Sequence, residues 1–136
     1  MNIVDTSGWI EYFFAGRNAS YFAAPIEKTR DLLVPVICLY EVFKKINMVA
    51  DEGKALQAVA QMNQRQVVDV TEDVALSAAL ISLKHKLPMA DSLLYATARA
   101  YQATLWTSDE HFDGLPGVHY KAAPTKTSKR RPKRRT

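Results

Sequence analysis

Short apolar runs alternate with longer helical segments along most of this chain of 136 residues. The runs have the length of buried strands, and the segments between them carry apolar residues at helical spacing. The expected strands cover residues 2–4, 32–36, 66–70, 104–106 and 118–120. Parallel strands need a crossover connection, which is usually a helix, so this alternation is typical of a parallel sheet. We therefore expect an α/β fold with three layers, in which a central parallel sheet of four to five short strands has helices on both faces.

The expected helices cover residues 7–16, 19–29, 37–50, 52–64, 72–86 and 90–101. Thr6 or Ser7 is a suitable N-cap for the first of them, and Thr71 for the fifth, which Pro88 then ends. The two helices within 37–64 are expected to form an αα-hairpin.

Charge is distributed unevenly along the chain. The net charge is +4, yet seven of the 18 basic residues lie in 126–136, which contains no acid. The remainder has 11 basic and 14 acidic residues, a net charge of −3. We therefore expect one domain over residues 1–121 and a basic, disordered tail over 122–136. Nonspecific attraction of the tail to RNA phosphates and simple solvation are equally good interpretations.

The sequence has features of a protein that works in the cytoplasm. No apolar run is long enough to span a membrane, and the first residues lack the basic region and cleavage site of a signal peptide. The single cysteine, Cys38, lies in an apolar run and is expected to be a buried core residue.

Three acids are each the only charge in an apolar stretch: Asp5 in 1–10, Glu41 in 32–43 and Asp91 in 87–98. A fourth acid, Asp109, follows the expected strand 104–106. Burial of a carboxylate without a partner costs several kcal/mol, so such residues persist where something pairs with them. No matching cations lie in the same apolar stretches, which favours a divalent metal ion as the partner.

The expected fold brings the four acids to one edge of the sheet. Asp5 and Asp109 follow strands directly, and Glu41 and Asp91 lie near the starts of helices next to strands. Ligands bind at the carboxyl ends of the strands in open α/β sheets. Carboxylate oxygens are typical ligands of Mg²⁺ or Mn²⁺, and the absence of His or Cys at metal spacing disfavours zinc. Such a site usually acts on phosphate, with a water molecule that the metal activates.

Each acid also has a purely structural interpretation. Asp5 and Asp91 are suitable helix caps, Glu41 is placed to interact with a helix dipole, and Asp109 is placed in a surface turn. The four acids taken together favour the metal site. The aromatic residues of the first helix are interpreted as core and as an interface with a second copy of the chain or with another protein, in preference to base stacking: Trp9, Tyr12, Phe13 and Phe14.

Four segments in order resemble the motifs of PIN-domain ribonucleases, and specifically of the VapC toxins of toxin–antitoxin modules. They are IVDTS with Asp5, LYEVF with Glu41, PMADSLLYATA with Asp91, and LWTSDEHF with Thr107, Asp109 and Phe112. The resemblance covers residues 1 to about 120.

The resemblance implies a toxin that cleaves RNA endonucleolytically, with Mg²⁺ or Mn²⁺ held by Asp5, Glu41, Asp91 and Asp109. It implies a homodimer, within a larger toxin–antitoxin assembly, and inhibition by a VapB-like antitoxin. Thr6 or Ser7 and Thr107 would support the acids or position water. His111 has no catalytic role in this resemblance. Either Glu110 or Asp113 is close enough in sequence to replace Asp109.

Other functions remain as alternatives. One is a free-standing PIN-like RNA-processing nuclease, and another is a non-catalytic RNA-binding module. A phosphatase or phospho-acceptor domain is disfavoured because the D-x-D motif of the haloacid-dehalogenase type is missing after the first strand. A receiver domain would use an acid such as Asp69, but the early acid pair and the late lysine that it needs are absent.

Overall fold

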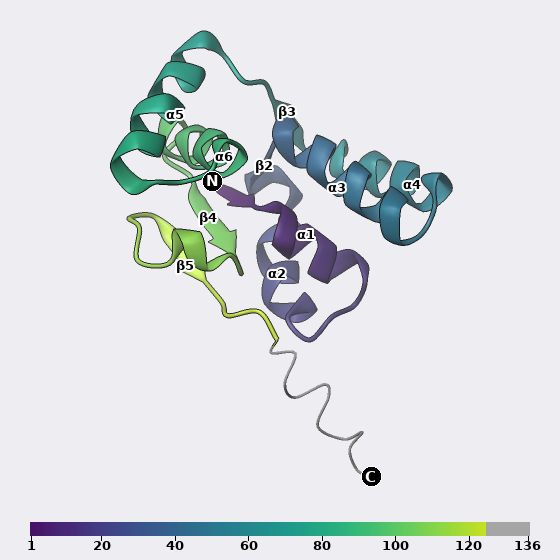
Figure 1. Cartoon of the computed structure of the whole chain (residues 1–136). Coiled ribbons are helices and arrows are strands. Elements are labelled where there is room, and N and C mark those ends of the chain that lie inside the picture. The colour runs from purple at the N-terminus through teal and green to yellow at the C-terminus, as the bar shows by residue number, and fades with distance from the viewer. Residues whose placement is uncertain (125–136) are drawn as a thin grey trace.

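The computed structural model describes residues 1–124, which form a central sheet with helices on both faces (Figure 1). Residues 125–136, most of the predicted basic tail, lie outside the described residues. No helix in residues 1–124 is long and apolar enough to cross a membrane.

The sheet has five parallel strands in the order β3-β2-β1-β4-β5. The strands are β1 (Asn2–Val4), β2 (Leu32–Pro35), β3 (Gln66–Val68), β4 (Thr104–Thr107) and β5 (Val118–Tyr120). The central strands are buried on both faces, because helices cover each side, and this explains why their sequences are continuously apolar. The prediction of a parallel α/β sheet is confirmed, with five strands. The third strand ends at Val68, two residues earlier than expected.

Six α-helices connect the strands. They are α1 (Thr6–Phe13), α2 (Ala19–Ile26), α3 (Val36–Val49), α4 (Glu52–Met62), α5 (Glu72–His85) and α6 (Met89–Ala100), with two 3₁₀ turns, η1 (Thr29–Asp31) and η2 (Glu110–Phe112). The chain moves outward from β1 to β3 and then crosses back to β4. Right-handed crossovers therefore place α1 to α4 on one face of the sheet and α5 and α6 on the other (Figure 1).

The core lies between the sheet and these helices. Trp9, Phe22 and Phe112 are among its largest fully buried side chains. Cys38 is fully buried as expected, and its thiol donates a long hydrogen bond to the Val4 carbonyl, 3.8 Å away. This contact ties α3 to the end of β1.

The first helix begins one residue earlier than predicted. Its N-cap is Asp5, whose Oδ1 accepts from the Gly8 N–H at 3.2 Å, so Thr6 and Ser7 are first-turn residues and not the cap. The helix follows β1 with no intervening loop because Gly8 lets it pack closely. A Cβ at Gly8 would lie 2.5 Å from Val4 Cγ1. The predicted cap of α5 is confirmed, since Thr71 Oγ1 accepts from the Val74 N–H.

Candidate functional site

The sheet reverses its order between β1 and β4. The connections that leave β1 lead to β2 and β3 on one side, whereas β4 and β5 lie on the other. In parallel α/β sheets the crevice outside the carboxyl ends of the strands at such a point is the usual binding position. Val4 is in register with Trp106, and the Asp5 N–H donates to the Trp106 carbonyl at 3.1 Å. Asp5 and Thr107 therefore leave the sheet side by side.

Asp5 is buried at this edge, with 4% of its surface exposed. Its Oδ1 accepts from Ser7 Oγ at 2.5 Å as well as from the Gly8 N–H, and its Oδ2 accepts from Thr107 Oγ1 at 2.6 Å. Burial raises the pKa of Asp5 from 3.8 to about 6, although these hydrogen bonds lower it, and the negative charge of Asp109 adds to the increase. The carboxylate is thus fixed in orientation, and no cation within residues 1–124 forms an ion pair with it.

Asp109 is held in place by the turn that follows β4. Its N–H donates to Thr107 Oγ1 at 2.8 Å, and its Oδ1 accepts from the His111 N–H at 2.9 Å as the N-cap of η2. Phe112, at the end of that turn, is fully buried and anchors it. Thr107 therefore links Asp5 to Asp109, donating to one and accepting from the other.

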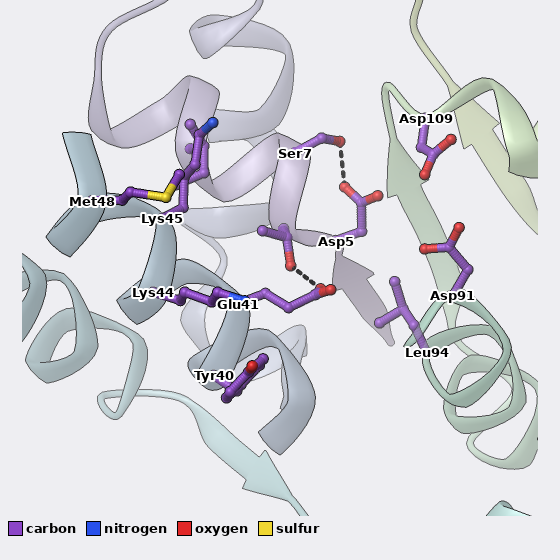
Figure 2. Close-up of a pocket in the computed structure, with 12 residues that line it drawn as sticks. Asp5, Ser7, Tyr40, Glu41, Lys44, Lys45, Met48, Asp91, Leu94 and Asp109 are labelled. Atoms are coloured by element: carbon purple, nitrogen blue, oxygen red, sulfur yellow. Dashed lines mark hydrogen bonds between the residues drawn. The ribbon is translucent and has the colours of Figure 1, made fainter. Parts of the chain in front are cut away.

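Glu41 approaches from α3, on the opposite side of Asp5 from Asp91 and Asp109 (Figure 2). It lies in the second turn of that helix, close to the helix start as expected, but outside the first turn on which the dipole interpretation depends. Its Oε1 accepts from Thr6 Oγ1 at 2.6 Å. The two residues that follow Asp5 thus each orient a different acid: Thr6 binds Glu41, and Ser7 binds Asp5.

Asp91 lies in the first turn of α6 and is half-buried. Because this helix runs antiparallel to β4, its start lies at the carboxyl edge of the sheet. Burial raises the pKa of Asp91, as does the charge of Asp109, while a contact with His111 lowers it. The His111 Nδ1 atom is 3.2 Å from both Asp91 Oδ2 and Asp109 Oδ1. The charge of Asp109 and the bond to Asp91 raise the pKa of His111.

These side chains line one cleft of about 530 Å³. All four predicted acids and two of the predicted supporting residues line it: Asp5, Glu41, Asp91, Asp109, Thr6 and Ser7. Thr107 is fully buried beneath them. In Figure 2 the carboxylates of Asp5, Asp91 and Asp109 face a common space. Neither Glu110 nor Asp113 lines the cleft, and both are exposed, so the structure places Asp109 and not its neighbours with the other acids.

The donor set suits a hard divalent cation. The groups that converge are carboxylates from β1, α3, α6 and the loop after β4, and Mg²⁺ and Mn²⁺ prefer such oxygen ligands. One ligand atom from each of Asp91, Asp109 and His111 lies within 4.8 Å of the others. Burial and the charge of Asp109 raise the pKa values of Asp5 and Asp91, so both groups are costly to ionise in the folded chain. A bound cation would offset that cost by stabilising the ionised carboxylates.

Some residues of the site were missed from the sequence. His111 is 55% exposed but contacts two of the acids, and its position two residues after Asp109 was the available signal. Besides Glu41, four other residues of α3 line the cleft: Tyr40, Lys44, Lys45 and Met48. The spacing of the two lysines, three and four residues after Glu41, places them on the same side of the helix and was the signal for them.

Comparison with known proteins agrees with this geometry. The PIN domain model matches residues 3–118. No curated protein sequence matches the chain significantly. Similar solved structures include a toxin–antitoxin complex from Klebsiella pneumoniae, with 22% identity, coverage of 90% of this chain and 100% of that one, and a TM-score of 0.76.

Two others are VapC proteins or complexes. A VapC toxin from Mycobacterium tuberculosis that cleaves the sarcin–ricin loop is 19% identical, with 87% and 97% of the two chains covered and a TM-score of 0.74. DNA-bound VapBC from Salmonella typhimurium is 15% identical, with 90% and 98% covered and a TM-score of 0.71. At these identities the likeness shows a shared fold. With the family match over nearly the whole described chain, it leads to one conclusion: this chain belongs to the PIN domain family.

Proposed function

We propose that the chain is a metal-dependent endoribonuclease that acts as the toxin of a toxin–antitoxin pair. The observation that carries the proposal is the convergence of four carboxylates from separate elements in one cleft at the carboxyl edge of the sheet. Membership of the PIN domain family and the shared fold with VapC toxins support it. The four sequence motifs that resemble those of VapC toxins lie at this cleft.

Asp5, Glu41, Asp91 and Asp109 would hold Mg²⁺ or Mn²⁺. When bound, the metal supplies activation of a water molecule, a contact to a phosphate oxygen and stabilisation of the leaving alkoxide. The chain's own contribution is to fix the acids in advance. Thr107 and Ser7 orient Asp5, Thr6 orients Glu41, and the turn anchored by Phe112 orients Asp109.

The partners follow from the same proposal. RNA is the substrate, and a VapB-like antitoxin is the inhibitor, since several proteins with this fold were solved as toxin–antitoxin complexes. We also propose a homodimer and a larger toxin–antitoxin assembly in the cytoplasm. A free-standing PIN-like nuclease is distinguished by the absence of an antitoxin reading frame next to the gene.

A non-catalytic RNA-binding role is less well supported. Loss of one or more acids is the usual sign of an inactive nuclease site, and all four acids line this cleft. A phospho-acceptor role has no support either, because Asp69 follows β3 as an exposed residue and does not line the cleft.

The test is RNA cleavage by the purified chain, free of any antitoxin. We expect cleavage with Mg²⁺ or Mn²⁺ that leaves a 5′-phosphate and a 3′-hydroxyl, and its loss in EDTA. Asp91→Asn should abolish it, whereas Asp113→Asn, which changes an exposed acid outside the cleft, should not. Cleavage that persists unchanged in EDTA would sink the proposal.

A further inference from the structure

The cleft continues beyond the acids along the exposed side of α3. A second hollow of about 480 Å³ adjoins it, and Tyr40, Lys44 and Met48 line both. Tyr40 is 60% exposed and Met48 is 68% exposed. Figure 2 shows these side chains and Lys45 on the same helix as Glu41. The acid site therefore opens into a groove whose wall is the exposed side of α3.

This wall carries the positive charge of the cleft. Within residues 1–124, neither Lys44 nor Lys45 forms an ion pair with a carboxylate. Outside residues 126–136 the chain has a net charge of −3. Lys44 and Lys45 are the basic residues among those that line the cleft, and they lie beside its four acids. Lysines in such a position attract an anion that must also approach the acids.

The same wall carries an open aromatic surface. Lys44 Nζ lies 5.7 Å from the centroid of the Tyr40 ring, so the cation and the ring form one unit on the helix. Exposed aromatic rings stack with unpaired bases, and neighbouring lysines neutralise the phosphates between them. The residues from Glu41 to Lys45 span about 6 Å along the helix axis, so the acids and the basic wall are adjacent.

A strand of RNA with one phosphate at the acids must continue out of the cleft on either side. We propose that the Tyr40–Lys44–Lys45 face of α3 binds single-stranded RNA next to the scissile phosphate, with a base stacked on Tyr40 and phosphates at the two lysines. This inference rests on the proposed ribonuclease function and identifies the substrate as single-stranded at this position. Charge complementarity and continuity with the acid site favour RNA over a protein segment here.

The test measures binding separately from cleavage. Fluorescein-labelled oligo(U) and oligo(A) are titrated with the Asp91→Asn chain in EDTA, which prevents cleavage, and anisotropy gives the affinity. We expect Tyr40→Leu to weaken binding roughly 5- to 100-fold, since stacking contributes at that level per base, and Tyr40→Phe to retain most of it. Thermal unfolding midpoints should not change, because the ring is exposed.

The lysines have a distinct signature in salt. Each phosphate contact contributes about −0.7 to the slope of log K against log [salt] for single strands, so Lys44→Gln/Lys45→Gln should reduce that slope by about 1.4. Tyr40→Leu should leave the slope as it is. A matched control, Lys54→Gln/Lys84→Gln, removes two exposed lysines elsewhere and should affect neither affinity nor slope to this extent.

Two results would overturn this inference. One is equal affinity and salt slope in the groove variants and the control. The other is unchanged RNA binding together with loss of a protein partner, which would assign the face to that partner. If the wild-type chain cleaves RNA in either case, the ribonuclease function stands without this groove. If the groove variants lose RNA binding but the wild type cleaves no RNA, the groove stands and the ribonuclease function fails.

Discussion

Replacement of Asp5 by asparagine should stabilise the metal-free chain while it removes metal binding. Asp5 is 4% exposed, and burial raises its pKa from 3.8 to about 6. In the unfolded chain this carboxyl ionises near pH 3.9. Between these two values the folded state holds a proton that the unfolded state has lost, so the free energy of unfolding falls as the pH rises.

The magnitude follows from the size of the shift. At 1.36 kcal/mol per pKa unit, the ionised carboxylate lowers the free energy of unfolding by ~3 kcal/mol above pH ~6. Asparagine keeps one oxygen, which can accept from the Gly8 N–H and Ser7 Oγ. The NH₂ group that replaces the second oxygen cannot accept from Thr107 Oγ1. Loss of that bond costs about 1 kcal/mol. The expected net gain is about 1–2 kcal/mol at neutral pH, or a rise in Tm of roughly 3–8 °C.

The assay is urea and thermal unfolding in EDTA, from about pH 4 to about pH 8, with Asp113→Asn as the matched control for loss of an exposed charge. As the pH rises through this range, the free energy of unfolding of the wild type should fall relative to that of Asp5→Asn. The two curves should cross near pH ~5, and below it the wild type should be the more stable by up to about 1 kcal/mol, because it keeps the bond from Thr107. Saturating Mg²⁺ should then reverse the order, because a ligand at 100 times its Kd adds ~2.7 kcal/mol to the chain that binds it.

The reasoning is refuted if Asp5→Asn is no more stable than the wild type in EDTA at neutral pH, or if both show the same pH profile. Equal stabilisation of both chains by Mg²⁺ would show that Asp5 is not part of the metal site.

Thr107→Val removes a buried donor to Asp5, so the free energy of unfolding should fall by about 1–3 kcal/mol in urea melts, with partial rescue by Thr107→Ser; an unchanged melt would contradict this role. Gly8→Ala places a methyl group against Val4, so we expect a loss of about 1–3 kcal/mol, and a neutral effect would mean that α1 can shift. The neighbouring acids raise the pKa of His111, and a protonated His111 pairs with the carboxylates that would bind the metal. The affinity for Mn²⁺, measured by calorimetry, should therefore weaken as the pH falls, and it should weaken less steeply in His111→Gln. Parallel pH profiles would contradict that competition.

The fold was predictable because its signals are local. Each strand is a short apolar run, and breakers such as Pro88 stand between the elements, so the alternation that requires a parallel sheet is visible in the chain. The start of α1 was less predictable. Asp5 both ends the strand and caps the helix, and this is possible only because Gly8 permits close packing between the two. That packing is a property of the folded chain.

The site was predictable to the extent that its residues interrupt apolar sequence. Asp5, Glu41 and Asp91 were each conspicuous as isolated charges, and the structure places them with Asp109 in one cleft. His111 lies in polar sequence, and Lys44 stands beside a second lysine on a helix that has one buried side, so a charge at either position is unremarkable. Their proximity to the acids depends on the turn after β4 and on the direction of α3, which only the assembled sheet determines.

The central claim is that one metal site, built by these acids, performs the cleavage. The most direct measurement follows Mn²⁺ binding by electron paramagnetic resonance and RNA cleavage in the same titration of the purified chain. We predict that binding and cleavage rise together, and that Asp91→Asn loses both while its fold remains intact. Cleavage by Asp91→Asn, or Mn²⁺ binding at this site without any RNA cleavage, would contradict the account.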